Sequence, residues 1–116
     1  MRSYKELIVW QKSIELVVTM YEITEKFPKS ELFGLISQMR RAAVSIPSNI
    51  AEGSRRRSIK DSSHFYTIAF ASGAELETQI EIVKHLPFSK NMSFTRIDQL
   101  LDEVMRMLNK LAYRIE

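Results

Sequence analysis

Cysteine is absent from this 116-residue sequence, and residues that break helices are scarce. Without cysteine, the chain has no disulfide framework, no thiolate metal site and no cysteine nucleophile. Only three glycines and three prolines are present, which argues against a turn-rich all-β fold. The longest strictly apolar run, Leu7 to Trp10, is far too short to cross a membrane, and the first residues lack the apolar core of a signal peptide. We therefore expect a cytoplasmic protein that has no contact with a membrane.

The remaining composition is that of an ordinary globular protein, with 45% hydrophobic and 27% charged residues. A chain of this length fits one domain, so we expect residues 1–116 to form a single four-helix-bundle domain. The formal net charge of +3 is unevenly distributed. Residues 55–60 carry four basic side chains and no acid, so the rest of the chain is nearly neutral.

Apolar residues recur at helical spacing in four segments, and no strand pattern is present. The expected helices span about residues 4–26, 30–53, 58–86 and 93–116, and prolines or small polar residues separate them. Four helices with short connections predict an all-α fold, an antiparallel up-down-up-down four-helix bundle.

Three of the segments have an apolar stripe that we expect to face the core, and the last has the clearest one, an uninterrupted seven-residue repeat. Further apolar residues exceed what one core stripe requires, so a lone bundle would expose a large apolar patch, which favours an oligomer. The predicted stripes are Leu7, Trp10, Ile14, Val17 and Tyr21 in the first segment; Phe65, Ile68, Ser72, Glu75, Leu76, Gln79 and Val83 in the third; and Phe94, Ile97, Leu101, Val104, Leu108, Leu111 and Ile115 in the fourth. The surplus residues are Ile8, Val9, Val18, Phe70, Ile82, Leu100 and Met107.

Pro47 lies inside the second helical pattern. Because Ile50 stays in phase with the apolar residues before the proline, we expect a kink and a helix that continues to Gly53, with Gly53 as a left-handed cap. The side chains of Ser45, Ser48 and Asn49 are placed to bond the carbonyl groups that a kink frees. The alternative for Asn49 is a direct contact with a ligand.

The four basic residues Arg55, Arg56, Arg57 and Lys60 precede and open the third predicted helix. Arginine forks onto phosphate oxygens, and helix N-termini attract anions, so one interpretation is a phosphate-binding site for nucleic acid. The other is a solvated loop that pairs in part with Glu52 and Asp61.

Glu75 falls on the predicted apolar stripe of the third helix, where a carboxylate needs a partner. Arg40 and Arg41 on the second helix are the candidates, and we prefer an ion pair of Arg41 with Glu75, either between helices or between subunits. A general acid or base is the alternative, but no nucleophile accompanies it.

Histidines occur at His64 and His85 alone, and their spacing fits no metal motif. No glycine-rich phosphate loop or nucleophile elbow is present either. We therefore predict no metal, no cofactor and no enzymatic activity.

The stretch from Arg41 to Gly53, RAAVSIPSNIAEG, resembles the signature of the four-helix-bundle family first noted in intervening sequences of bacterial 23S ribosomal RNA genes. Ser54 and Arg55 depart from the family pattern, which often has an aromatic residue and a second glycine there. Arginine in place of that glycine stiffens the loop and adds a charge. Further matches lie at 7–12, Phe27-Pro28, Gln38, 56–58 and 72–79.

This resemblance implies a ring-like homopentamer. The chain is also similar to the accessory protein of diversity-generating retroelements, which binds nucleic acid and a reverse transcriptase. The expected function is therefore a non-enzymatic homopentamer that binds RNA or DNA phosphates through Arg55, Arg56, Arg57 and Lys60. The alternative is an adaptor that docks a protein partner, such as a reverse transcriptase, without binding nucleic acid itself.

Overall fold

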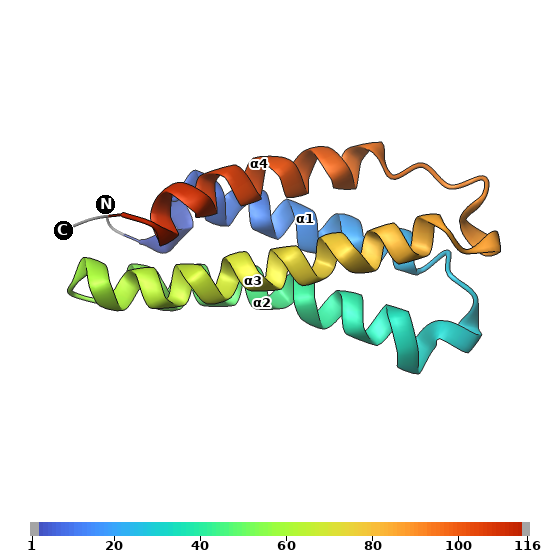
Figure 1. The fold of residues 1–116 in the computed structure, drawn as a ribbon, viewed down its shortest axis with the longest axis horizontal. Coiled ribbons are helices and arrows are strands. Elements are labelled where there is room, and N and C mark those ends of the chain that lie inside the picture. Colours follow the sequence, from blue (N-terminus) through green and yellow to red (C-terminus); the bar gives the residue numbers. More distant parts are fainter. Residues whose placement is uncertain (1–2, 115–116) are drawn as a thin grey trace.

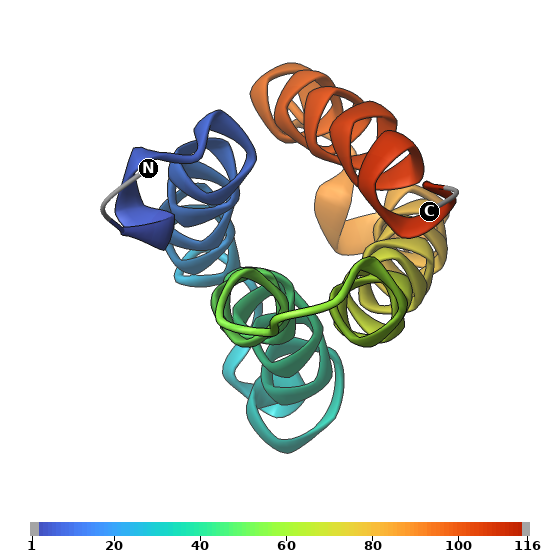
Figure 2. The ribbon, with the colours of Figure 1, turned by 90° about the vertical axis from the view of Figure 1, so that its left-hand side faces the viewer.

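The computed structural model describes residues 3–114 and contains four long helices, with no strand in that range. They are α1 (Ile8–Thr24), α2 (Ser37–Ser54), α3 (Ile59–Lys84) and α4 (Thr95–Ala112). Successive helices run in opposite directions (Figure 1), so the fold is the expected all-α up-down-up-down bundle. Seen end-on, the helices form a four-cornered arrangement in which α1 and α3 each pack against both α2 and α4 (Figure 2).

Short turns connect the helices and replace parts of the predicted ones. A 3₁₀ turn, Tyr4–Glu6, precedes α1, and a second one, Pro87–Ser89, precedes α4. Between α1 and α2 the chain forms a 3₁₀ turn, Lys29–Glu31, and then a π-helical turn, Leu32–Ile36, in which Gly34 departs from helical dihedral angles. The second long helix therefore begins seven residues later than the Ser30 start that the sequence suggested.

The seven-residue repeat of the last helix is confirmed as a core stripe. Phe94, Ile97, Leu101, Val104 and Leu108 are all buried, and Leu100 is fully buried beside them. Leu111 is half-buried, and Ile115 lies outside the described residues. A repeat of this kind keeps one seam of a helix against its neighbours, as a bundle requires.

The predicted core stripe of α1 is wrong at Ile14 and Tyr21, whereas Leu7, Trp10 and Val17 are half-buried and pack against the core. The core takes a neighbouring stripe, Val9, Ser13, Leu16, Met20 and Thr24, whereas Ile14 and Tyr21 are 36% and 41% exposed. The two buried hydroxyl groups bond to carbonyl oxygens one turn back, Ser13 to Trp10 at 2.7 Å and Thr24 to Met20 at 2.6 Å. Because each small polar group is satisfied within its own helix, it can lie in the core at little cost.

The predicted face of α3 is confirmed at Leu76, Gln79 and Val83, which are buried. Phe65 and Ser72 of the predicted stripe are half-buried, whereas Ile68 and Glu75 are exposed. The buried face also includes Tyr66, Ala69, Gly73 and Ile80, which the prediction left out. Glu75 therefore does not face the core, and no burial of its charge has to be compensated within the chain.

Gly53 is not a left-handed cap, since none of the glycines in residues 3–114 has a positive φ. Instead it lies in the last turn of α2, which runs through Pro47 without ending, as expected. A β-carbon at Gly53 would come within 2.7 Å of the Tyr66 ring and 3.1 Å of the Ser62 carbonyl oxygen. Gly53 therefore permits a close approach between α2 and α3.

Gly53→Ala is expected to lower the free energy of unfolding by about 1–2 kcal/mol, because overpacking costs about 1–3 kcal/mol and the helix propensity of alanine offsets at most about 1 kcal/mol. Gly73→Ala is the matched control. Its β-carbon would meet the end of the flexible Met105 side chain, which can move aside, so we expect a change within about 1 kcal/mol. Urea denaturation followed by circular dichroism measures both, and equal stability of the two variants would contradict the steric role of Gly53.

Candidate functional site

The basic residues of the α2–α3 turn lie at the end of the bundle where α4 also finishes (Figure 2). Arg55, Arg56 and Arg57 form this turn, and Lys60 lies in the first turn of α3. All four side chains are exposed. Ser58 caps α3, since its Oγ accepts a hydrogen bond from the Asp61 backbone N–H at 3.1 Å. The positive end of the helix dipole therefore adds to the charge of the arginines.

Two of the arginines stack on aromatic rings. The Arg55 guanidinium carbon lies 5.3 Å from the centroid of the Tyr4 ring. The Arg56 guanidinium carbon lies 4.4 Å from the centroid of Phe65, and its Nη2 is 2.8 Å from the Glu52 carboxylate. Stacking on a ring holds a guanidinium plane in place while its edge stays available to acceptors.

Arg57 differs from its neighbours. It is exposed, and within residues 3–114 its side chain has no ion pair, hydrogen bond or ring contact. Arg55 also lacks an acidic partner in the described part of the chain. The partial pairing that the solvated-loop interpretation predicts is present between Arg56 and Glu52, whereas Arg55 and Arg57 are exposed and have no acidic partner in residues 3–114, as either interpretation allows.

The structure adds Arg114 to this basic end. Its Nη2 donates to the Ser62 hydroxyl at 2.9 Å, and its guanidinium carbon lies 5.5 Å from the centroid of the Tyr66 ring. Burial raises the pKa of the Tyr66 phenol, and the positive charge of Arg114 opposes that rise. The predicted topology could have indicated that Arg114 belongs to this basic end, because an up-down bundle brings the end of its fourth helix beside the turn between its second and third helices.

The preferred partner of Glu75, Arg41, makes no ion pair with it in the single chain. Ser45 Oγ and Ser72 Oγ lie 2.8 Å apart across the α2–α3 seam, and this register places Arg41 opposite Glu75 one turn further along. Both side chains are exposed. The interhelical form of the pair is therefore not present, and the intersubunit form stays a prediction.

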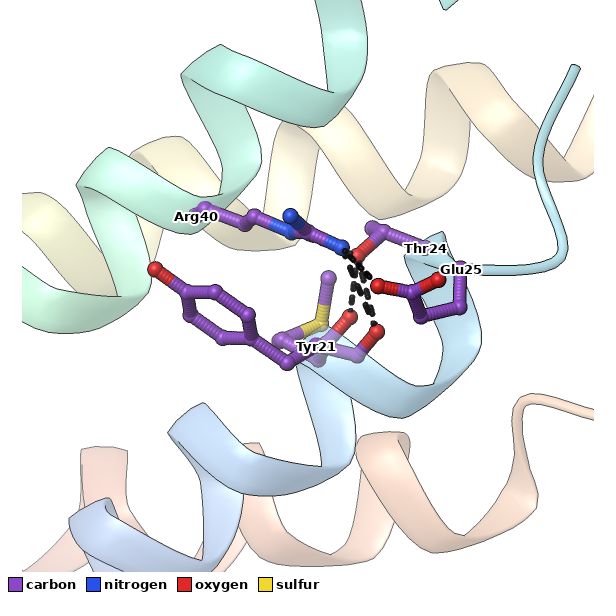
Figure 3. A network of polar contacts seen from close by, with 5 residues as sticks. Tyr21, Thr24, Glu25 and Arg40 are labelled. Atoms are coloured by element: carbon purple, nitrogen blue, oxygen red, sulfur yellow. Dashed lines mark hydrogen bonds and ion pairs between the residues drawn. The ribbon is translucent and has the colours of Figure 1, made fainter. Parts of the chain in front are cut away.

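Arg40, the other candidate, is engaged with the end of α1 (Figure 3). Its Nε donates to Thr24 Oγ1 at 2.9 Å, and its Nη2 lies 3.4 Å from the Tyr21 carbonyl oxygen and 3.5 Å from Glu25 Oε1. The guanidinium carbon also lies 4.3 Å from the centroid of the Tyr21 ring. Arg40 therefore joins α2 to the end of α1 and is not available to Glu75.

Polar side chains follow Pro47 closely. Asn49 Nδ2 donates to the Ser45 carbonyl oxygen at 2.9 Å and to Ser45 Oγ at 3.0 Å. Ser48 Oγ donates to the Val44 carbonyl oxygen at 2.9 Å. These bonds supply donors to carbonyl groups next to the proline, which has no N–H of its own.

An apolar surface runs along α1 and α2 on the side away from the core. A hollow of about 390 Å³ is lined by Trp10, Ile14, Val17, Val44 and Pro47, among others. A second hollow, of about 500 Å³, adjoins it at Val44 and is lined by Tyr21, Leu32, Phe33 and Arg41, among others. Phe33, in the π-helical turn, is 92% exposed. We call this surface the α1–α2 face.

The surplus apolar residues divide between core and surface. Val9 and Leu100 are core residues, and Phe70 and Met107 are half-buried. Ile8, Val18 and Ile82 are 62%, 53% and 46% exposed. Exposed apolar groups of this number on a small bundle are typical of a protein that buries surface against a partner.

Neither a cluster of potential metal ligands nor a membrane-spanning helix occurs in residues 3–114. No group of three or more potential metal ligands occurs in that range. His85 Nδ1 lies 2.8 Å from the Glu81 carbonyl oxygen, which occupies one ring nitrogen. No helix within those residues has the length and apolar character that a membrane crossing requires.

Comparison with known proteins agrees with the sequence resemblance. None of the curated proteins compared with the chain matches it. A family model described as "23S rRNA-intervening sequence protein" matches residues 5–110, a span that contains α1, α2, the basic turn, α3 and all of α4 except its last two residues. The chain therefore belongs to the family of 23S rRNA-intervening sequence proteins.

Proposed function

We propose that this chain is a cytoplasmic, non-enzymatic homo-oligomer, a pentamer, that binds the phosphate backbone of RNA or DNA through Arg55, Arg56, Arg57 and Lys60. The observation that carries the proposal is the basic end of the bundle, where exposed guanidinium groups without acidic partners lie beside the N-terminus of α3. The guanidinium groups and the helix N-terminus both attract anions, and they lie side by side at this end of the bundle.

Binding takes place by charge neutralisation. Each arginine that contacts a phosphate displaces condensed counterions, so affinity falls steeply as salt rises. Stacking on Tyr4 and Phe65 orients the Arg55 and Arg56 guanidinium groups before the nucleic acid arrives. Those rings are covered by arginine, so few bases stack on them and the sequence of the nucleic acid matters little.

The α1–α2 face supports the oligomeric part of the proposal. A ring needs two different surfaces on each subunit, since each copy contacts the next head to tail. The α1–α2 face supplies an apolar surface that ends in Phe33 and Arg41, and the outer side of α3 supplies Ile68, Ile82 and Glu75. Arg41 of one subunit then pairs with Glu75 of its neighbour.

A second candidate function rests on the same face. Phe33 and the hollows beside it are suited to a protein ligand of another kind, in which case the chain is an adaptor and binds no nucleic acid itself. The two functions differ in whether the arginine turn is needed for binding.

Replacement of Arg55, Arg56 and Arg57 by serine is expected to weaken binding of single- or double-stranded oligonucleotides. The slope of log K against log salt should flatten by about 2 or more, because each lost phosphate contact removes roughly 0.7–0.9 from it. Fluorescence anisotropy at 50 and 200 mM salt measures this. Binding that is insensitive to salt, or equal in the variant and the parent, would refute the phosphate proposal and favour the adaptor.

Phe33→Ser is expected to leave the isolated bundle folded, because the side chain is 92% exposed and contributes little to the core. If the α1–α2 face joins subunits, the same change lowers the mass of the assembly, whereas Phe33→Leu keeps an apolar group there and changes it less. Light scattering after size exclusion measures the mass. A parent protein that is monomeric at micromolar concentration contradicts the ring.

Charge reversal tests the intersubunit ion pair. Arg41→Glu and Glu75→Arg should each shift the assembly toward monomers, since each places like charges together at the contact. The double variant restores the pair with its partners exchanged and should recover the parent mass. Because neither side chain has an ion pair within residues 3–114, the reversals are expected to leave the fold intact. A double variant that is no better than the single ones shows that the two residues do not meet.

A further inference from the structure

A pocket lies behind the basic turn, between the end of α2, the first turns of α3 and the end of α4. Its volume is about 280 Å³. A water molecule occupies about 30 Å³ in the liquid, so this space is sufficient for a phosphate group together with the sugar that bears it. The pocket is lined by Leu7, Gly53, Ser54, Arg56, Arg57, Ser58, Ile59, Ser62, Tyr66, Leu111 and Arg114.

Arg56, Arg57 and Arg114 line the pocket together with Ser54, Ser58, Ser62 and Tyr66. Ser54 Oγ already donates to the Ala51 carbonyl oxygen, and Ser62 Oγ donates to the Ser58 and Ile59 carbonyl oxygens, so the donors left for a ligand come chiefly from the arginines. No carboxylate of the described residues lines the pocket, although Glu52 pairs with Arg56 beside it. Ile59 begins α3, and the first N–H groups of a helix have no acceptor within it. Such a lining is suited to an anion with several oxygen atoms.

Arg114 is positioned before any ligand arrives. It donates from Nη2 to Ser62 Oγ at 2.9 Å and from Nε to the Leu111 carbonyl oxygen at 3.3 Å. A guanidinium group has five N–H donors, so three remain for an anion. All five N–H donors of Arg57 are available to an anion, since its side chain makes no hydrogen bond, ion pair or ring contact in the described part of the chain. One arginine is thus fixed at the side of the pocket and the other is able to close over it.

The charge of the lining fits the end of a strand better than its middle. An internal phosphodiester has one negative charge, whereas a phosphomonoester carries about −1.5 to −2 at pH 7 and presents three free oxygens. Even with Arg56 paired to Glu52, the charges of Arg57 and Arg114 together with a helix N-terminus exceed what one phosphodiester neutralises. The Tyr66 ring is covered by Arg114, so the pocket offers no open aromatic surface to a base.

We propose that this pocket binds a terminal phosphomonoester of a nucleic-acid strand, with Arg57 and Arg114 as its main ligands. The inference deepens the proposed function and rests on it, because Arg55 and Lys60 outside the pocket hold the phosphates that follow. Leu7, Ile59 and Leu111 then contact the terminal sugar.

The experiment compares two short single-stranded RNAs of one sequence, with and without a 5′-phosphate, by fluorescence anisotropy on the full chain. We expect the 5′-phosphate to tighten binding about tenfold, as charge-assisted hydrogen bonds to one additional dianionic group imply. Arg57→Gln and Arg114→Gln should each abolish most of this gain. Arg96→Gln is the matched control, because Arg96 lies at the opposite end of α4 in an exposed pair with Glu15, and it should keep the gain.

Thermal unfolding of each variant checks the fold. If Arg114→Gln is unstable, Arg57→Gln still tests the proposal, because Arg57 has no hydrogen bond, ion pair or ring contact within residues 3–114 to lose. Equal affinity for the two RNAs, with salt-dependent binding of both, overturns the terminal-phosphate pocket and leaves the proposed function standing. Binding of neither RNA overturns the terminal-phosphate pocket, and it overturns the proposed function as well if double-stranded DNA also fails to bind. Titration with millimolar adenosine 5′-monophosphate, followed by NMR, distinguishes a strand end from a free nucleotide as the ligand. If the mononucleotide binds and the RNA does not, the pocket is a nucleotide site and the strand-end proposal is overturned.

Discussion

The close approach of α2 and α3 at Gly53 is the constraint on which the basic end of the bundle depends. With no side chain at position 53, the helix backbone reaches the Tyr66 ring and the Ser62 carbonyl group. The turn between the helices is therefore short, and the three arginines that form it are held together. The same Tyr66 and Ser62 position Arg114 by stacking and by a hydrogen bond. The absence of a β-carbon at Gly53 thus allows the arginines of the α2–α3 turn and Arg114 to lie at one pocket.

The α2–α3 pairing also determines what the outer surface presents. The Ser45–Ser72 hydrogen bond lies at the seam, and Asn49 donates to both the carbonyl and the hydroxyl oxygen of Ser45. These small polar groups satisfy one another, so the seam needs no charged residue to close it. Arg41 and Glu75 therefore stay exposed on either side of it, free to contact another molecule. Arg40 has a different role because it faces α1 and binds Thr24 there.

Much of the fold could be predicted from the sequence, and the prediction of the buried face failed only in part of α1 and α3. The repeat of α4 allows one buried seam only, so its core face followed directly from the pattern. In α1 and α3 two stripes with the same spacing compete, and the apolar one was not always the buried one: Ser13 and Thr24 are buried whereas Ile14 and Tyr21 are exposed. Hydrogen bonds to their own helix make those hydroxyl groups acceptable in the core, and composition does not reveal this. Arg114 was missed because its role depends on which helix ends meet.

The competition between stripes has a physical cause. A helix that buries one face needs apolar residues on that face alone, but α1 carries Trp10, Ile14 and Val17 on a second face that its own bundle leaves partly uncovered. Apolar area costs free energy in water, and a second copy of the chain that covers it recovers that cost. Assembly also changes what the basic end achieves. In the proposed ring, arginine turns that would each bind phosphates weakly act on the same strand at a high effective concentration. Under that proposal the exposed α1–α2 face and the arginine turn have linked roles, because assembly through the face raises the affinity of the turn.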